Sequence, residues 1–166
     1  MAKDDEFAEF VSARWLTLVR AALALGCPLP EAEDLAQTTM VKVYVSWSKV
    51  TRAEHRDAYV STMLVNAHRD TFRKRRETPV AVLPDRAGLD ATATVDSADA
   101  INRAVRRLSQ GQREVIALRY FVRLTEPEIA AALGVAPGTV KSRLSRALDA
   151  LSADADLTDL RDGGTS

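Results

Sequence analysis

The chain has 166 residues, 46% of them hydrophobic and 28% charged, which suits a globular protein with one ordinary core or two small ones. Its 23 Lys and Arg balance 23 Asp and Glu, and the pI of about 6.7 lies below the value above ~9 expected of a protein that binds nucleic acid alone. Cys27 is the single cysteine, which excludes an internal disulfide and disfavours a cysteine-based metal site. With no secretory signal in the acidic first residues and no apolar run near the roughly 20 residues of a membrane span, we expect a cytoplasmic protein without membrane insertion.

Apolar residues recur at helical spacing through the first half of the chain. They predict a helix over residues 7–25, a second helix from Pro30 through Trp47, and a third that begins near Asp57, where Asp57 can act as the N-cap. The polar stretch 48–56 connects the second and third helices. No internal repeat and no alternation of the β type interrupts this pattern.

The third predicted helix has two distinct faces. Asn66, Arg69 and Arg73 share a polar face, and the apolar stripe on another side is made by Val60, Met63, Leu64, Ala67 and Thr71. Asn can pair with base edges and Arg with phosphates. The nearby aromatic residues are of the type that stacks unpaired bases, although core packing is the better interpretation for each one alone: Trp47, Tyr59 and Phe72.

Residues 77–97 contain two prolines, a glycine, small residues and acids, a composition typical of a flexible linker. We therefore predict an all-α fold of two small helical domains joined by this linker. The first domain covers residues 1–76 and the second covers 98–152. Residues 153–166 form an acidic tail.

The second domain contains several helix-capping signals. A helix is predicted over Ala98–Leu108, with Ile101, Val105 and Leu108 facing inward. Ser109 with Gln112, and Thr125 with Glu128, have capping-box spacing, so one helix should run from Ser109 through about Val122 and another from Thr125. Gly134 should end that helix with a left-handed cap, and a basic helix follows from Pro137. This is the geometry of a helix-turn-helix.

The basic helix should place its polar side chains in the major groove of duplex DNA. After removal of the inward Val140 and Leu144, the candidates for DNA contact are Thr139, Lys141, Ser142, Arg143, Ser145 and Arg146. Lys and Arg can donate to guanine, and Ser and Thr suit phosphates or either base. The competing interpretation is a structural helical hairpin whose basic face is only hydrated.

Basic residues are concentrated in the blocks 66–76 and 103–123, with acidic stretches between them. Each block alone could be an ordinary solvated helix face, but two blocks beside apolar periodicity favour two nucleic-acid contacts. His55 and His68 lack partners at metal-ligand spacing and are interpreted as surface or capping residues. Glu33 and Asp34 lie near a helix start, where acids favour the helix dipole. We expect no enzyme activity, no cofactor and no metal.

Two longer stretches resemble one family. "AEDLAQTTMVKVY" with "YVSTMLVNAHRDTFRKRR" resembles region 2 of bacterial sigma factors, and "LSQGQREVIALRYFVRLTEPEIAAALGVAPGTVKSRLSRALDAL" resembles region 4. In this order and with a short linker, they are similar to the small two-domain sigma factors of the extracytoplasmic-function group over about residues 5–152. The resemblance implies a protein that binds core RNA polymerase and directs it to promoter DNA.

The resemblance also implies roles for individual residues. Asn66, Arg69 and Arg73 match the face that reads the −10 element, the loop after Val50 would hold a flipped base, and the helix from Pro137 matches the one that reads the −35 element. The linker would thread toward the active-site and RNA-exit path. Core polymerase would dock on Asp34, Leu35, Gln37, Thr38, Val41 and Tyr44. An anti-sigma factor is a further candidate partner.

Two alternatives remain at this point. The second domain could belong to a stand-alone helix-turn-helix transcriptional regulator, or the chain could be an adaptor that binds only protein. Ala136 is a departure from the family, which often has Ser or Thr at this N-cap.

Overall fold

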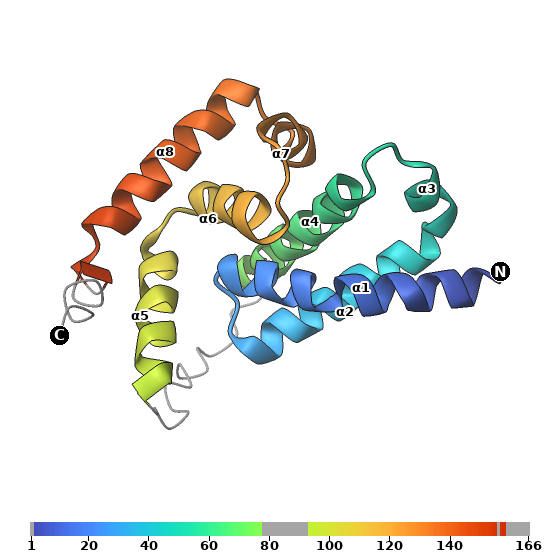
Figure 1. Ribbon diagram of the computed structural model, residues 1–166, viewed down its shortest axis with the longest axis horizontal. Coiled ribbons are helices and arrows are strands. Elements are labelled where there is room, and N and C mark those ends of the chain that lie inside the picture. Colours follow the sequence, from blue (N-terminus) through green and yellow to red (C-terminus); the bar gives the residue numbers. More distant parts are fainter. Residues whose placement is uncertain (1, 78–92, 156, 159–166) are drawn as a thin grey trace.

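The computed structural model describes residues 2–77, 93–155, 157 and 158. Within these residues every regular element is helical, which confirms the predicted all-α fold of two helical domains, called here the first and second modules (Figure 1). The first module contains α1 (Lys3–Ala24), α2 (Leu29–Val45), α3 (Trp47–Arg52) and α4 (Arg56–Glu77). The second contains α5 (Ala93–Arg107), α6 (Gln110–Ile116), the π-helical η1 (Ala117–Phe121), α7 (Glu126–Leu133) and α8 (Pro137–Ala153).

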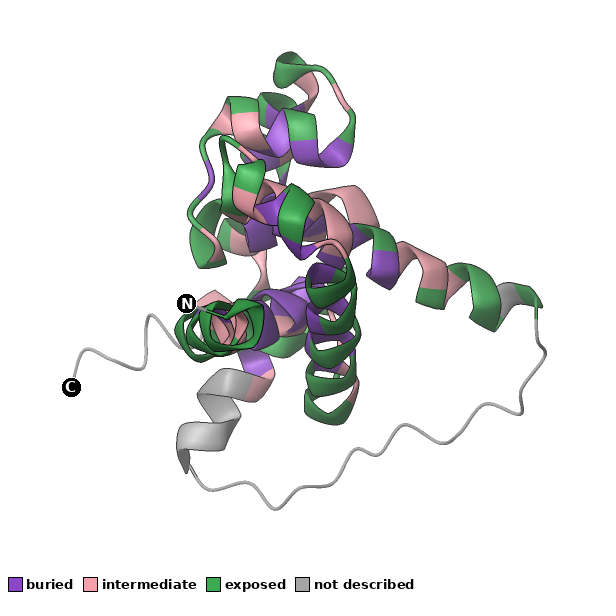
Figure 2. Cartoon of the chain, turned by 90° about the vertical axis from the view of Figure 1, so that its right-hand side faces the viewer, coloured by how far each residue is buried: buried purple, intermediate pink, exposed green. Residues whose placement is uncertain are grey.

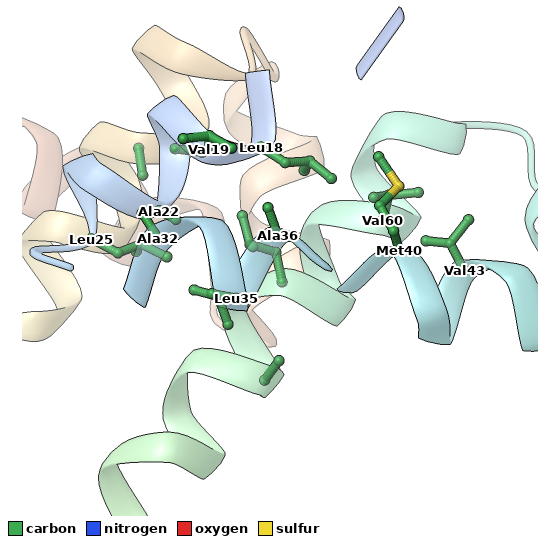
Figure 3. Packing of buried hydrophobic residues seen from close by; sticks show 14 of the residues in the cluster. Leu18, Val19, Ala22, Leu25, Ala32, Leu35, Ala36, Met40, Val43 and Val60 are labelled. Carbon is green, nitrogen blue, oxygen red and sulfur yellow. The ribbon is translucent and has the colours of Figure 1, made fainter. Parts of the chain in front are cut away.

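The core of the first module forms where α1 and α2 run side by side and α4 packs against α2. Small residues at the contact, such as Ala22, Ala32 and Ala36, are fully buried and let the helix axes approach closely (Figure 3). Larger side chains fill the space around them, among them Leu18 and Val43. This packing fixes the outward faces of α2 and α4.

The second predicted helix is divided in two. α2 ends at Val45 and the short α3 covers Trp47–Arg52, so the polar stretch predicted as a connection is largely helical. Trp47 and Val50 are buried, and the Trp47 ring lies edge-on to Phe10 at 5.5 Å between centroids. These contacts hold α3 on the core, but a helix of six residues is too short to show a helical period in the sequence.

The second module confirms most of the capping predictions. Ser109 with Gln112, and Thr125 with Glu128, form complete capping boxes at α6 and α7. Gly134 ends α7 with φ 67° and ψ 37°, a left-handed cap that glycine adopts without a Cβ clash.

Two helix predictions in the second module were wrong in detail. The helix predicted from Ser109 through Val122 changes at Ala117 from α to π geometry, because the backbone accommodates one extra residue while Ala117 and Leu118 stay buried. In α5, Val105 and Leu108 are buried as predicted, but Ile101 is 49% exposed, and Ala100 and Ala104 are buried in its place.

Most of the predicted linker, residues 78–92, lies outside the described residues, as do residue 156 and residues 159–166 of the acidic tail. Both ends of the predicted linker are helical. Glu77 is the last residue of α4, and residues 93–97 are the first five residues of α5.

The two modules share their cores rather than standing apart. Ala117 from the second module is buried in the core of the first, and Val65 from α4 is buried in the core of the second. Buried positions therefore continue from the helices of the first module to those of the second (Figure 2). The last turns of α4 project away from both modules and are mostly exposed. This close packing was not predicted from the sequence.

Candidate nucleic-acid interfaces

The helix-turn-helix is built on a shared apolar seam between α7 and α8. Ile129 and Leu133 from α7 pack with Val140 and Leu144 from α8, and all four are buried. α8 begins at Pro137 after the extended N-cap Ala136, which has no side-chain oxygen for capping. The seam turns the opposite side of α8 toward solvent.

Four of the six predicted α8 contact residues are exposed on that side: Lys141, Ser142, Ser145 and Arg146. Together with Gly138 they line one shallow groove along the helix. Lys141 and Arg146 form no ion pair with any other residue in the described part of the chain. Thr139 is half-buried at the start of the helix. The exposed face therefore offers unpaired cationic and hydroxyl donors, the groups that contact duplex DNA.

Arg143 differs from the other basic residues of α8. It is half-buried, and its side chain lies over Gly111 of α6, with Nε 3.1 Å from the position that a Cβ would occupy there. The guanidinium therefore covers the α6–α8 contact, and we remove Arg143 from the group of freely exposed DNA candidates.

The polar face of α4 is only partly free. Asn66 and Arg73 are exposed, and Arg73 has one loose ion pair with Asp70 at 3.6 Å. Arg69, in contrast, makes a bidentate ion pair with Glu114 of α6, with Nε to Oε2 at 2.9 Å and Nη2 to Oε1 at 3.0 Å. The structure thus brings the three predicted residues onto one face but engages the central one with the second module.

Two of the three aromatic residues near this face pack in the core, and the third contacts a histidine. Trp47 is buried, Tyr59 is half-buried against the core of the first module, and Phe72 lies edge-on to His68 at 4.8 Å. Thr51, which begins the loop region expected to hold a flipped base, is still in α3 and donates its hydroxyl to the carbonyl of Ser48.

The outer face of α2 presents most of the residues expected to meet polymerase. The exposed ones are Asp34, Gln37, Thr38, Val41 and Tyr44. Val41 is 60% exposed, and the neighbouring Tyr44 and Val45 are exposed as well, so the apolar side chains of this face are open to solvent. Leu35 is buried in the core of the first module, so we remove it from the contact set.

Tyr44 is held in place at the edge of this face. Its hydroxyl donates a hydrogen bond to Oδ1 of Asp4 at 2.8 Å, and Lys3 Nζ lies 4.1 Å from the centre of its ring. The bond to Asp4 and the charge of Asp4 raise the pKa of Tyr44. Phe7, Val11, Trp15 and Met40 join Val41 and Tyr44 in lining an apolar groove between α1 and α2.

Both modules match sigma-factor sequences. Residues 12–78 match the family model for Sigma-70 region 2, and residues 98–151 match that for Sigma-70, region 4. The RNA polymerase sigma-E factor of Streptomyces avermitilis is 34% identical over 157 residues, 93% of this chain and 88% of that protein. The ECF RNA polymerase sigma factor SigL of Mycobacterium tuberculosis is 33% identical over 141 residues, 81% of this chain and 80% of that protein. The chain belongs to the extracytoplasmic-function sigma factors.

Two solved structures share the fold of this sigma factor. CnrH in complex with the cytosolic domain of CnrY is similar at a TM-score of 0.67 and 24% identity, over 98% of this chain and 91% of that one. RpoE in complex with the anti-sigma factor NepR from Bartonella quintana is similar at 0.66 and 29% identity, over 87% and 94%. The match to region 2 as well as to region 4 excludes the stand-alone regulator. The chain is a sigma factor that directs RNA polymerase.

The sigma factor also contains a buried histidine that was predicted to lie at the surface. His68 on α4 is 4% exposed, and its Nδ1 has no hydrogen-bond partner among the residues that the structure describes. Burial, helped by the nearby Arg113 and Arg75, lowers the pKa of His68 to about 4. Burial likewise raises the pKa of the neighbouring Cys27 thiol to about 11, which makes it a poor nucleophile. The apolar spacing of α4 could have indicated His68, which follows the buried Ala67.

No helix in the described part of the sigma factor is long and apolar enough to cross a bilayer.

Proposed function

We propose that this sigma factor divides promoter recognition between its modules, with α8 reading the −35 element and the polar face of α4 reading the −10 element. The observation that carries the proposal is the presence of two separate exposed donor faces on a chain whose 23 basic residues are balanced by 23 acidic ones. Because a neutral chain gains little affinity from phosphates alone, specific binding should require a second component that supplies it. That component is core RNA polymerase.

At the −35 element, Lys141 and Arg146 are the proposed readers of base edges. Ser142 and Ser145 lie beside them on the same exposed face and are suited to phosphates or either base. Thr139, near the start of α8, is suited to a phosphate contact. Arg143 acts as a support for α8 through its position over Gly111.

At the −10 element, Asn66 is the proposed base reader, because an exposed amide can pair with an unstacked base. Arg69 and Arg73, about one and two turns further along α4, would hold neighbouring phosphates. Polymerase would dock on the outer face of α2, where Val41 supplies apolar area and Asp34 supplies charge. The sigma factor itself would be a recognition subunit without enzyme activity, acting in the cytoplasm with polymerase.

An anti-sigma factor is the further partner that we propose. Both similar structures were solved with a bound protein, the cytosolic domain of CnrY in one and the anti-sigma factor NepR in the other. The apolar groove between α1 and α2 is a surface on which such a partner could lie.

Run-off transcription with core polymerase and genomic DNA cut by a restriction enzyme tests the function. We expect discrete promoter-specific transcripts only when the protein is added, and loss of most of that signal with the double variant Lys141→Ala, Arg146→Ala. The matched control is Arg103→Ala, an exposed arginine of α5 outside both proposed DNA faces. Unspecific transcripts with and without the protein would contradict the proposal.

A further inference from the structure

A cavity of about 540 Å³ lies between the α1–α2 turn, α2, α4 and α5. Its volume is within the range of about 300–1,000 Å³ that is common for the sites of small organic ligands. Among the described residues that line it, none belongs to the proposed DNA faces of α4 and α8. The cavity therefore needs an explanation other than promoter recognition.

The buried wall of the cavity contains a histidine that lacks a partner at one nitrogen. His68 lines the cavity, is 4% exposed, and has no partner at Nδ1 among the residues that the structure describes. A buried polar nitrogen without a partner costs free energy, so native proteins pair such groups with a protein atom, an ordered water or a bound ion. With a pKa of about 4, the imidazole is neutral at pH 7 and offers one N–H to an acceptor.

A second nitrogen without a partner lies directly behind the cavity wall. Arg113 of α6 donates from Nη1 to the carbonyl of Arg106 at 3.2 Å, and its Nε lies 3.6 Å from the position of a Cβ on Gly26. Gly26 and Arg106 both line the cavity. Nε of Arg113 is buried and has no hydrogen-bond partner in the described part of the chain. This guanidinium adds a positive charge to the buried end of the cavity.

The charges around His68 favour an anion. Three arginines lower the pKa of His68, and Glu31 is the one carboxylate that raises it. Glu31 is already engaged by Arg75 in an ion pair on the cavity wall. Arg106 is exposed at the edge of the cavity and forms no ion pair with any residue that is described. Asp34, the other carboxylate of the lining, is exposed, so water screens its charge.

The remaining wall suits a flat apolar group. The Phe72 ring lines the cavity, lies edge-on to His68 at 4.8 Å between centroids, and belongs to neither core of the described residues. Leu35 and Ala67 are buried and complete the apolar side. A ligand with an aromatic part beside an anionic group would contact both kinds of wall.

We propose that this cavity binds a small organic anion, with its carboxylate or phosphate group held by His68 and Arg106 and its apolar part against Phe72. The ligand oxygens accept the N–H of the neutral imidazole and the charged donors of the guanidinium. The inference goes beyond promoter recognition, because none of the residues proposed to contact DNA holds the ligand.

Chemical-shift titration of the full chain tests the site, with benzoate and phenyl phosphate as probes. Each probe has a flat ring and an oxyanion, and together they distinguish carboxylate from phosphate recognition. The Nε–H signal of Arg113 and the backbone amides of Cys27 and Thr71 report on the cavity. We expect saturable shifts with at least one anion, at a Kd of about 1 mM or below, and no shifts with benzamide, the neutral isostere of benzoate.

Two variants test the assigned residues. His68→Phe keeps a ring of similar size and removes both nitrogens, so it should weaken binding about tenfold without lowering the Tm, because an apolar group replaces an unpartnered polar one. Arg106→Gln should weaken binding about fivefold through loss of the charged donor. Arg52→Gln, exposed on α3 and outside the cavity, is the matched control and should bind like wild type.

Three results would overturn the proposal. Absence of saturable shifts with both anions, at concentrations far above that Kd, would leave no ligand site. Benzamide binding as tight as that of benzoate would show an apolar pocket without anion recognition. Unchanged affinity in a folded His68→Phe would remove the group on which the site is built. Promoter-specific transcription by the holoenzyme is independent of all three, so failure here is distinguishable from failure of the proposed function.

Discussion

α4 and α8 carry similar polar residues, but the structure leaves them in different states. On α8 the basic residues Lys141 and Arg146 are exposed and unpaired with any other residue that is described, whereas on α4 Arg69 is engaged by Glu114. The difference comes from what packs beside each helix. α8 lies at the edge of the molecule, and α4 lies between its own module and the second one. A donor's residue type therefore predicts its chemistry, and the neighbouring module decides its availability.

The largest expected effect concerns the shared core. Ile129→Ala, in the fully buried seam of the helix-turn-helix, should lower the free energy of unfolding by about 2–5 kcal/mol. Both tryptophans, Trp15 and Trp47, lie in the first module, so their fluorescence reports on that module alone. Since the modules share cores, we expect the urea midpoint from tryptophan fluorescence to fall together with the midpoint from circular dichroism. An unchanged tryptophan midpoint would show that the modules unfold independently.

The next prediction concerns the difference between exposed and half-buried arginines on α8. Arg146→Ala should cost about 1–3 kcal/mol of holoenzyme binding to a promoter, and should relax preference at the upstream element only. Arg143→Ala, half-buried over Gly111, is the matched control and should leave base preference unchanged. Competition gel shifts with upstream-element variants measure this. A loss that is uniform across all upstream sequences would make Arg146 a phosphate contact.

On α4 the corresponding change is Asn66→Ala. The side chain is exposed, so stability should change by less than about 0.5 kcal/mol, while discrimination at the downstream element should fall by about 1–2 kcal/mol. Permanganate footprinting of unpaired thymines should show a weaker melted bubble in the holoenzyme. An intact bubble with unchanged downstream preference would place strand capture elsewhere, with residues 51–56 as the first alternative.

The smallest expected effect is on pH dependence. The pKa of His68 is about 4 in the fold against 6.5 ordinarily, so the unfolded chain takes up the proton first. This contribution to stability is complete above pH about 6.5 and is lost as the pH falls toward about 4. With allowance for solvent screening, we expect a loss of about 1 kcal/mol between pH 7 and pH 5.

Urea titrations at the two pH values measure that loss. His68→Gln should show a weaker pH dependence than wild type, because it removes the buried imidazole. Equal pH dependence in the two proteins would contradict the assignment to His68.

Local signals in the sequence predicted local structure well. The capping boxes at Ser109 and Thr125 and the cap at Gly134 were each predicted from spacing and residue type, because all the interacting groups lie within a few residues. Exposed faces followed from the same periodicity, including that of Lys141 and Arg146 on α8. The loop expected from Thr51 to Arg56 is shorter, covering residues 53–55, since Trp47 and Val50 hold the preceding segment in a helix on the core.

Contacts between distant segments could not be predicted in this way. Arg69 and Glu114 are 45 residues apart, and nothing in either local pattern indicates the other. The burial of His68 and Leu35 likewise depends on which helix covers them. The sequence therefore predicted which side chains could bind DNA, and only the packing shows which of them are occupied.

Promoter binding with and without core polymerase tests the central claim most directly. In a gel shift at one protein concentration and at physiological salt, we expect the free protein to give weak complexes with no preference between a promoter and a scrambled duplex. Addition of core polymerase should give a promoter-specific complex that tolerates Asp154→Asn and is weakened by Arg146→Ala. Equal specific affinity of the free protein and the holoenzyme for the promoter would contradict the account, because core polymerase would then add no affinity.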